Sequence, residues 1–269
     1  MFQNNFVSSC LMQEEPSSDL PILFLLLGAS NLARGYTLLT RHLSKCLEKS
    51  EINFINALGP GRGFCSRGGM FNFSYPSIQD CRAIEIAEKK SEKTRQRVVL
   101  ITDIGNDLMY GVSADTLIEG LDSLIDRMLK WDAEIFLTSI HVDLKKDVSP
   151  TTFFMLKSFF YPGSSITYEE TELFIKKVND YLKEKAEENE KVHLITGMEL
   201  FAGSDKIHYS LLKTHAAWSK VVDEIFQVLQ IPVKKKLRLV DGIVSIFANL
   251  KRLIICDMFR LKKKGREFF

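Results

Sequence analysis

Short apolar runs alternate along the chain with segments whose apolar residues recur every three or four positions. The runs that have the length and aliphatic content of buried strands are residues 22–27, 52–57, 97–102, 134–140 and 192–195. Strands that are apolar at nearly every position are buried on both faces, as in a parallel sheet covered by helices. The pattern therefore predicts an α/β protein with about five parallel strands in the middle of three α/β/α layers.

The segments between these strands carry the helical pattern. After the first strand, Leu32, Tyr36, Leu39, Leu43 and Leu47 fall on one face of a helix. The same spacing predicts helices between the third and fourth strands, over 169–185 and over 210–229.

Residues 148–168 fit neither pattern. This segment is aromatic, contains Pro150 and Pro162, and lies between a predicted strand and a predicted helix. Long connections in compact domains are enriched in functional segments, so it could be a lid or a wall of a substrate pocket. The alternative is a connection that is simply packed against the domain.

Charge separates the end of the chain from the rest. The whole chain has 36 Lys and Arg against 34 Asp and Glu, so its net charge gives no argument for nucleic-acid binding. Residues 233–269, however, hold eleven Lys and Arg against three Asp and Glu. Apolar residues keep a helical period over 234–264, with polar residues too frequent for a transmembrane helix. This basic amphipathic tail could lie on an anionic membrane surface, or it could dock on the domain or on another copy.

The chain is expected to act in a reducing compartment. Its cysteines are odd in number and form no CxxC pair, and no histidine cluster has metal-ligand spacing. The N-terminus lacks the basic and apolar regions of a secretory signal. We expect a cytoplasmic protein, perhaps attached to the inner face of the membrane by its tail, with no metal or cofactor. Its expected parts are an extension (1–19), a hydrolase-like domain (20–232) and the tail (233–269).

Polar and glycine-rich clusters follow four of the predicted strands. They are Gly28-Ala29-Ser30-Asn31, the glycine loop 59–63, residues 103–107, and residues 203–208. Reactive groups of an open parallel sheet gather outside the carboxyl ends of its strands, so we expect the four clusters at one edge of the sheet.

These clusters contain the parts needed for acyl transfer. Ser30 begins a helix, where backbone N–H groups favour negative charge on an oxygen. Its hydroxyl needs a base, which His208 can provide, while Asp205 can accept the other ring N–H and fix the tautomer. The N–H of Ser30, a glycine N–H and the Asn106 amide can stabilise the oxyanion.

The four clusters resemble, in order and spacing, the sequence blocks of the SGNH hydrolase, or GDSL-like lipase/esterase, superfamily. The resemblance covers about residues 20–230 and implies a flavodoxin-like fold that hydrolyses carboxylic esters, thioesters or O-acetyl groups through an acyl-serine, without a cofactor. It also implies Ser30 as the nucleophile, completed by Asp205 and His208, with Asn106 and one glycine as oxyanion donors.

Two features depart from the family pattern. Ala29 stands where the first block usually has Asp, which removes a residue that commonly supports the loop. The alternative function is therefore a catalytically inactive module of the same fold, which its basic tail recruits to a membrane or a partner. The glycine loop offers Gly59, Gly61 and Gly63, and counting from Asn56 favours Gly61 as the oxyanion donor.

The substrate is the least determined part of the site, although a small-molecule or lipid ester is expected. Arg62 could hold an anionic group of the substrate, or it could tie the glycine loop down. An apolar acyl site or a packed loop would equally explain Phe153, Phe154, Phe159 and Phe160. His141, which follows the fourth strand, is expected to be a packed residue.

Overall fold

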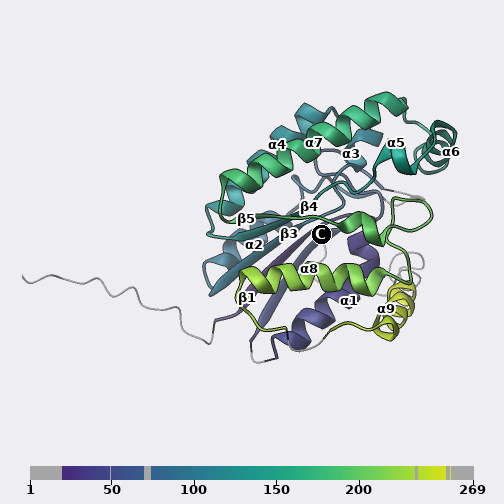
Figure 1. Cartoon of the computed structure of the whole chain (residues 1–269). Helices are drawn as coiled ribbons and strands as arrows, with labels where there is room; N and C mark the ends of the chain where they lie inside the picture. Colours follow the sequence, from purple (N-terminus) through teal and green to yellow (C-terminus); the bar gives the residue numbers. More distant parts are fainter. Residues whose placement is uncertain (1–19, 49, 70–73, 234–235, 253–254, 256–269) are drawn as a thin grey trace, which may run out of the picture.

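A five-stranded parallel sheet forms the centre of the protein (Figure 1). The computed structural model describes residues 20–48, 50–69, 74–233, 236–252 and 255. The strands are β1 (Ile22–Gly28), β2 (Ile52–Leu58), β3 (Gln96–Ile101), β4 (Glu134–Thr138) and β5 (Val192–Ile195), in the order β2-β1-β3-β4-β5. Neighbouring strands pair in parallel. Each of the five predicted strands is present, with its ends displaced by two residues or fewer.

Helices connect the strands and cover both faces of the sheet. They are α1 (Ser30–Cys46), α2 (Ala83–Ser91), α3 (Asn106–Met109), α4 (Ala114–Leu129), α5 (Leu144–Asp147), α6 (Pro150–Phe160), α7 (Tyr168–Glu188), the 3₁₀ helix η1 (Met198–Phe201), α8 (Thr214–Val228) and α9 (Leu239–Arg252). In Figure 1, α4 and α7 lie over one face of the sheet, and α1 and α8 lie over the other.

The interior strand β1 shows how the two layers are filled. All seven of its residues are buried. Leu23 and Leu25 pack into the core formed with α2, α4 and α7, while Phe24 and Leu26 pack into the core formed with α1 and α8. Successive side chains of a strand point to opposite faces, so a continuous apolar run supplies both cores. The predicted three-layer α/β/α fold is confirmed.

The segment that fitted neither sequence pattern contains a helix. Ser149 caps α6 by accepting a hydrogen bond from the Thr152 N–H at 3.1 Å, and Pro150 stands in the first turn, where it needs no hydrogen-bond acceptor. Phe153 is the buried residue of this helix. Its apolar residues lie on more than one face, which explains why no single-face spacing revealed it.

The tail begins with a helix that docks on the domain. Helix α9 packs against α1 and α8, and Leu237, just before it, joins the core on that side of the sheet. A Cβ placed on Gly242 would lie 3.4 Å from the Cβ of His215, so the two helices approach closely there. Within the described residues the tail therefore takes the docked form, and nothing there supports a membrane position. The predicted extension (1–19) and the end of the tail lie outside the described residues.

Among the described helices, none has both the length and the apolar character needed to cross a membrane.

Candidate active site

Ser30 lies at the first turn of α1, just after strand β1, and lines the apolar pocket described below. The preceding residue, Ala29, takes the N-cap position and has no side chain that could cap the helix. The unpaired N–H groups of a helix start give this position a positive potential. That environment suits a serine oxygen or an oxyanion that gains negative charge.

Asp103 supplies the cap that Ala29 lacks. Its Oδ2 atom accepts hydrogen bonds from the N–H groups of Ala29 at 3.0 Å and Leu32 at 2.9 Å, on either side of Ser30. It follows β3, the strand that pairs with β1, and its φ of 58° lies in the left-handed region. A non-glycine residue held in that region usually has a reason in its surroundings. Here the reason is a carboxylate aimed at the start of α1.

Asp205 and His208 form the expected pair. The Nδ1 atom of His208 lies 2.7 Å from Oδ2 of Asp205, while Oδ1 accepts from the backbone N–H of His208 at 2.9 Å and of Ile207 at 3.1 Å. Burial alone would raise the pKa of Asp205, but these hydrogen bonds and the nearby imidazole outweigh it and lower that pKa to about 2. The carboxylate thus stays ionised and holds the Nδ1–H tautomer, which leaves Nε2 to act as a base.

Asn31 joins the loop that carries His208 to the helix that carries Ser30. Its Nδ2 donates to the carbonyl of Ile207 at 3.2 Å, and its Oδ1 accepts from the N–H of Tyr209 at 2.8 Å. Because these two partners flank His208, the side chain that follows Ser30 helps to fix the position of His208. Asn31 is 4% exposed, so these bonds are protected from water.

The Ser30 hydroxyl and the His208 ring are not hydrogen-bonded to each other in the described residues of this structure. The missing bond does not argue against a joint role of the two side chains, because catalytic hydrogen bonds are often long without substrate and shorten when substrate is bound. The ring of Phe160 lies edge-on to that of His208, with 6.4 Å between the centroids.

Asn106 begins α3 and reaches the glycine loop. Its Nδ2 donates to the carbonyl of Arg62 at 3.0 Å, and its Oδ1 accepts from the hydroxyl of Tyr161 at 2.9 Å. The fixed amide also lines the pocket beside Ser30. Its second N–H remains available to a ligand there, since an amide nitrogen carries two.

Asp107, the next residue, holds the glycine loop in shape. Its buried carboxylate accepts backbone hydrogen bonds from Phe64 at 2.7 Å and from Cys65 and Ser66 at 2.8 Å. A Cβ on Gly63 would lie 2.8 Å from Oδ1 of Asp107, which leaves no room for a side chain. The Asn-Asp pair therefore joins the ends of β2 and β3.

Gly61 has a φ of 71°, a conformation that glycine adopts without strain. Its carbonyl accepts from the Tyr110 hydroxyl at 2.5 Å, which anchors the turn. The glycines of this loop are not among the residues that line the pocket. Gly61 as the oxyanion donor stays a prediction.

Arg62 is placed by the structure in the loop rather than in the pocket. Its side chain is fully buried, its Nε donates to the carbonyl of Pro76 at 3.0 Å, and its guanidinium lies 5.8 Å from the ring centroid of Tyr75. A group that is buried and bound in this way stabilises the loop and does not meet a substrate. Of the two alternatives drawn from the sequence, the placement favours the structural one.

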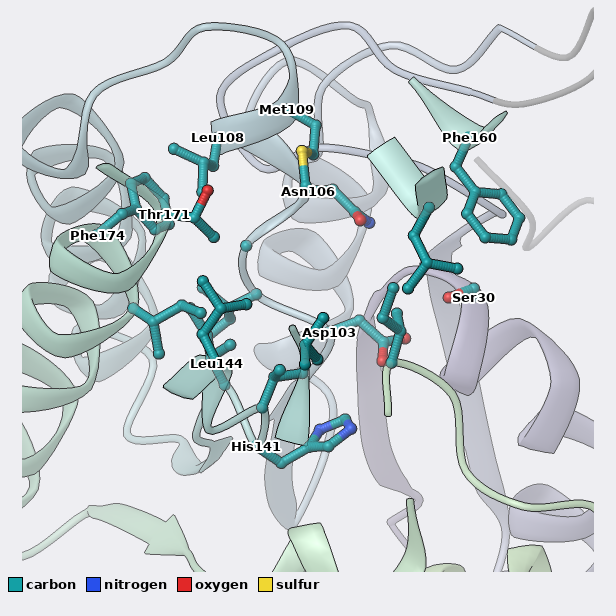
Figure 2. A pocket seen from close by; sticks show the side chains of 18 of the residues that line it. Ser30, Asp103, Asn106, Leu108, Met109, His141, Leu144, Phe160, Thr171 and Phe174 are labelled. Carbon is teal, nitrogen blue, oxygen red and sulfur yellow. The ribbon is translucent and has the colours of Figure 1, made fainter. Parts of the chain in front are cut away.

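An apolar pocket opens beside Ser30, between β4, α3, α6 and α7 (Figure 2). It has a volume of about 150 Å³ and is lined by Phe153 and Phe160, but not by Phe154 or Phe159. The latter two are 63% and 67% exposed on the outside of α6. The four phenylalanines thus divide into two in the pocket wall and two on the surface.

His141 also lines this pocket, close to Asp103 in Figure 2. Burial lowers its pKa, although the neighbouring Asp103 opposes that change. Its Nε2 atom is buried and has no hydrogen-bond partner among the described residues. The described residues hold no group of three His, Cys, Asp or Glu side chains placed like the ligands of a metal ion.

Sequence reasoning missed Asp103 and Asn31 as parts of the site. Ala29 could have indicated Asp103. Alanine cannot cap a helix, so the N–H groups at the start of α1 need an acceptor from another part of the chain. Asn31 gave none, since its partners are more than 170 positions away along the chain.

Several solved structures resemble this fold. One is the psychrotrophic esterase EstA from Pseudoalteromonas sp., inhibited by monoethylphosphonate, with a TM-score of 0.49 and 17% identity over 77% of this chain and 98% of that one. A lipolytic G-D-S-L family member from Veillonella parvula has a TM-score of 0.39 and 13% identity, over 86% and 97% of the two chains. A carbohydrate esterase family 3 protein from Talaromyces cellulolyticus has a TM-score of 0.42 and 12% identity, over 78% and 98%.

No protein-family model and no curated protein matches the chain. The structures found are of the kind that the four sequence blocks resemble, but the likeness is too distant to assign an activity, a substrate or a residue role to this chain.

Proposed function

We propose that the protein is a serine hydrolase that cleaves carboxylic esters through an acyl-serine, with Ser30 as nucleophile and Asp205 and His208 as its partners. The observation that carries the proposal is the double hydrogen bond of Asn31, which ties the Asp205–His208 loop to the turn that presents Ser30. If Ser30 only began the helix, the fold would have no need to attach the loop that carries His208 to the neighbouring Asn31.

The reaction has two halves, acylation of Ser30 and hydrolysis of the acyl-serine, and the same groups act in both. Nε2 of His208 takes the Ser30 proton while Oγ attacks the carbonyl carbon of the ester, and the carbonyl oxygen becomes an oxyanion. The N–H of Ser30, the N–H of Gly61 and the Asn106 amide stabilise that oxyanion. His208 then protonates the leaving alcohol oxygen as the C–O bond breaks. Water repeats the sequence on the acyl-serine, releasing the acid and restoring Ser30.

The substituted first block does not argue strongly for an inactive module. The missing side chain at Ala29 would leave the loop without a carboxylate, but Asp103 provides one from the adjacent strand. This supports the catalytic alternative over a module that only binds.

Labelling with a fluorophosphonate tests the proposal, because the reagent reacts with an activated serine. We expect the full chain to be labelled at Ser30, as located by mass spectrometry of the labelled peptide, and Ser30→Ala to lose the label. Ser204→Ala, which changes an exposed serine near the base, is the matched control and should label as the wild type does. Absence of labelling in folded wild-type protein would reject the proposal.

A further inference from the structure

The pocket beside Ser30 runs away from the nucleophile toward α7. In Figure 2, Ser30 and Phe160 lie at one side of it, and Thr171 and Phe174 lie at the opposite side. Both α7 residues are 4% exposed, so they close that end against the core. A group attached to the Ser30 oxygen therefore has one enclosed direction to follow.

We propose that this pocket binds the acyl chain of the ester, and that Thr171 and Phe174 set the longest chain it accepts. The inference rests on the proposed function, since it assumes that an acyl group is attached to Ser30. It assigns the substrate class as esters of unbranched aliphatic acids of medium length, in preference to acetyl esters of sugars.

The surface that the pocket wall offers to a ligand is mainly carbon. Its apolar residues come from the loop after β4 and from α3, α5, α6 and α7, and include Leu108, Ile140, Leu144, Leu156, Phe153 and Ile175. A sugar would need hydrogen-bond partners in this wall, because burying a hydroxyl group without a partner weakens binding. An alkyl chain needs none.

Most polar groups in the wall already have partners within the protein. The Thr171 hydroxyl donates to the carbonyl of Thr167 at 2.7 Å, and Thr138 donates to Thr102 at 2.9 Å. The Lys157 ammonium donates to the carbonyl of Ile166 at 2.9 Å. The Nε2 atom of His141 is an exception, and this residue lies toward Asp103 and Ser30, where the polar ester group would be (Figure 2).

The volume limits the chain length. An apolar cavity of about 150 Å³ lined by aliphatic and aromatic side chains accepts a ligand the size of benzene. Acyl groups of about six carbons should therefore fill it. Each buried methylene should raise kcat/KM about fourfold until the far end is reached.

A series of p-nitrophenyl esters from acetate to decanoate tests the inference on the full chain. We expect kcat/KM to rise about 250-fold from acetate to an optimum near hexanoate, which has four more methylenes, and to fall for longer chains. Thr171→Leu places a larger side chain at the far end, which shortens the pocket, and should move the optimum to shorter acids by about two carbons. Phe174→Leu places a smaller side chain there, which lengthens the pocket, and should move the optimum to longer acids.

The matched control is Leu173→Ala, on the same helix but 67% exposed and outside the pocket, which should leave the optimum unchanged. Fluorophosphonate labelling of every variant separates the possible failures. If wild-type protein is not labelled at Ser30, the proposed function is rejected, and this inference with it. Wild-type protein that is labelled but prefers acetate, shows a flat profile or cleaves none of the esters would overturn this inference alone. Labelled variants with unshifted optima would also overturn it.

Discussion

The two ends of the pocket are held in place by different forces. Around Ser30, charged and amide side chains from distant parts of the chain meet in hydrogen bonds of 2.7–3.2 Å. At the far end, the walls that α6 and α7 present to the pocket are mainly apolar, and the few polar groups there bond to neighbouring backbone carbonyls. Hydrogen bonds fix the direction and distance of a group, whereas apolar packing fixes only a volume. Changes at the first end should therefore affect the rate of the chemical step, and changes at the second should affect the choice of substrate.

The largest expected effect at the hydrogen-bonded end comes from Asp205→Asn. The amide can no longer hold the Nδ1–H tautomer or stabilise an imidazolium, so kcat should fall about 10³–10⁴-fold while KM changes little. Steady-state kinetics on the preferred ester measures both constants. Ser204→Ala, in the same loop, should keep wild-type values. A kcat within tenfold of wild type would show that Asp205 does not orient the base.

Asn31→Ala should have the next largest effect. It removes both hydrogen bonds that hold the His208 loop to α1, so the base should be misplaced and kcat should fall about 100-fold. Leaving the buried partners unpaired should also lower the free energy of unfolding by about 2 kcal/mol. Asn31→Asp retains the acceptor for Tyr209 and should be intermediate in kcat. A loss of stability with unchanged kcat would mean that Asn31 has a structural role only.

Asp103→Asn should reduce kcat by about tenfold. The amide oxygen still reaches the N–H groups of Ala29 and Leu32, but the bonds lose their charge-assisted character, so the start of α1 is held less firmly. Asp103→Ala removes the acceptor altogether and should cost more in kcat. A positioning role predicts that KM stays the same for both variants. An increase in KM with constant kcat would place Asp103 in substrate binding instead.

The sequence was sufficient to predict the sheet, which the structure confirms, and to nominate the residues proposed for the chemistry, because both follow from local order. The five strands are continuous apolar runs, and Ser30, Asp205 and His208 lie directly after strands or within a few residues of one another. Each of these features can be identified without knowing how the strands are arranged.

The supporting residues could not be predicted in the same way. Asp103 caps α1 because β3 pairs with β1 in the order β2-β1-β3, which the linear sequence does not state. The same limit applies to Arg62, whose partner Pro76 is on the far side of its loop. Helix α6 was missed because its aromatic residues divide between the pocket and the surface, and so lack the one-face spacing of a typical helix.

The smallest expected effect concerns stability and pH, and it separates the contribution of Asp205 to folding from the catalytic role proposed for it. The folded pKa of Asp205 is about 2, below the value of about 3.9 for an unfolded chain, so its ionised form favours the folded state. This contribution is present above about pH 4 and is lost as the pH falls through the folded pKa. Because the side chain is 31% exposed, we expect a difference of about 1–2 kcal/mol between wild type and Asp205→Asn at neutral pH.

Urea unfolding followed by tryptophan fluorescence at several pH values measures that difference. It should stay constant from pH 7 to about 4 and narrow below that, because the unfolded chain then binds a proton that folded wild-type protein does not. A difference that is constant from pH 7 to 3 would mean that the carboxylate has no linkage to folding. One that disappears already between pH 6 and 5 would come from another titrating group, and the hydrogen bonds to His208 and Ile207 would then serve orientation and not stability.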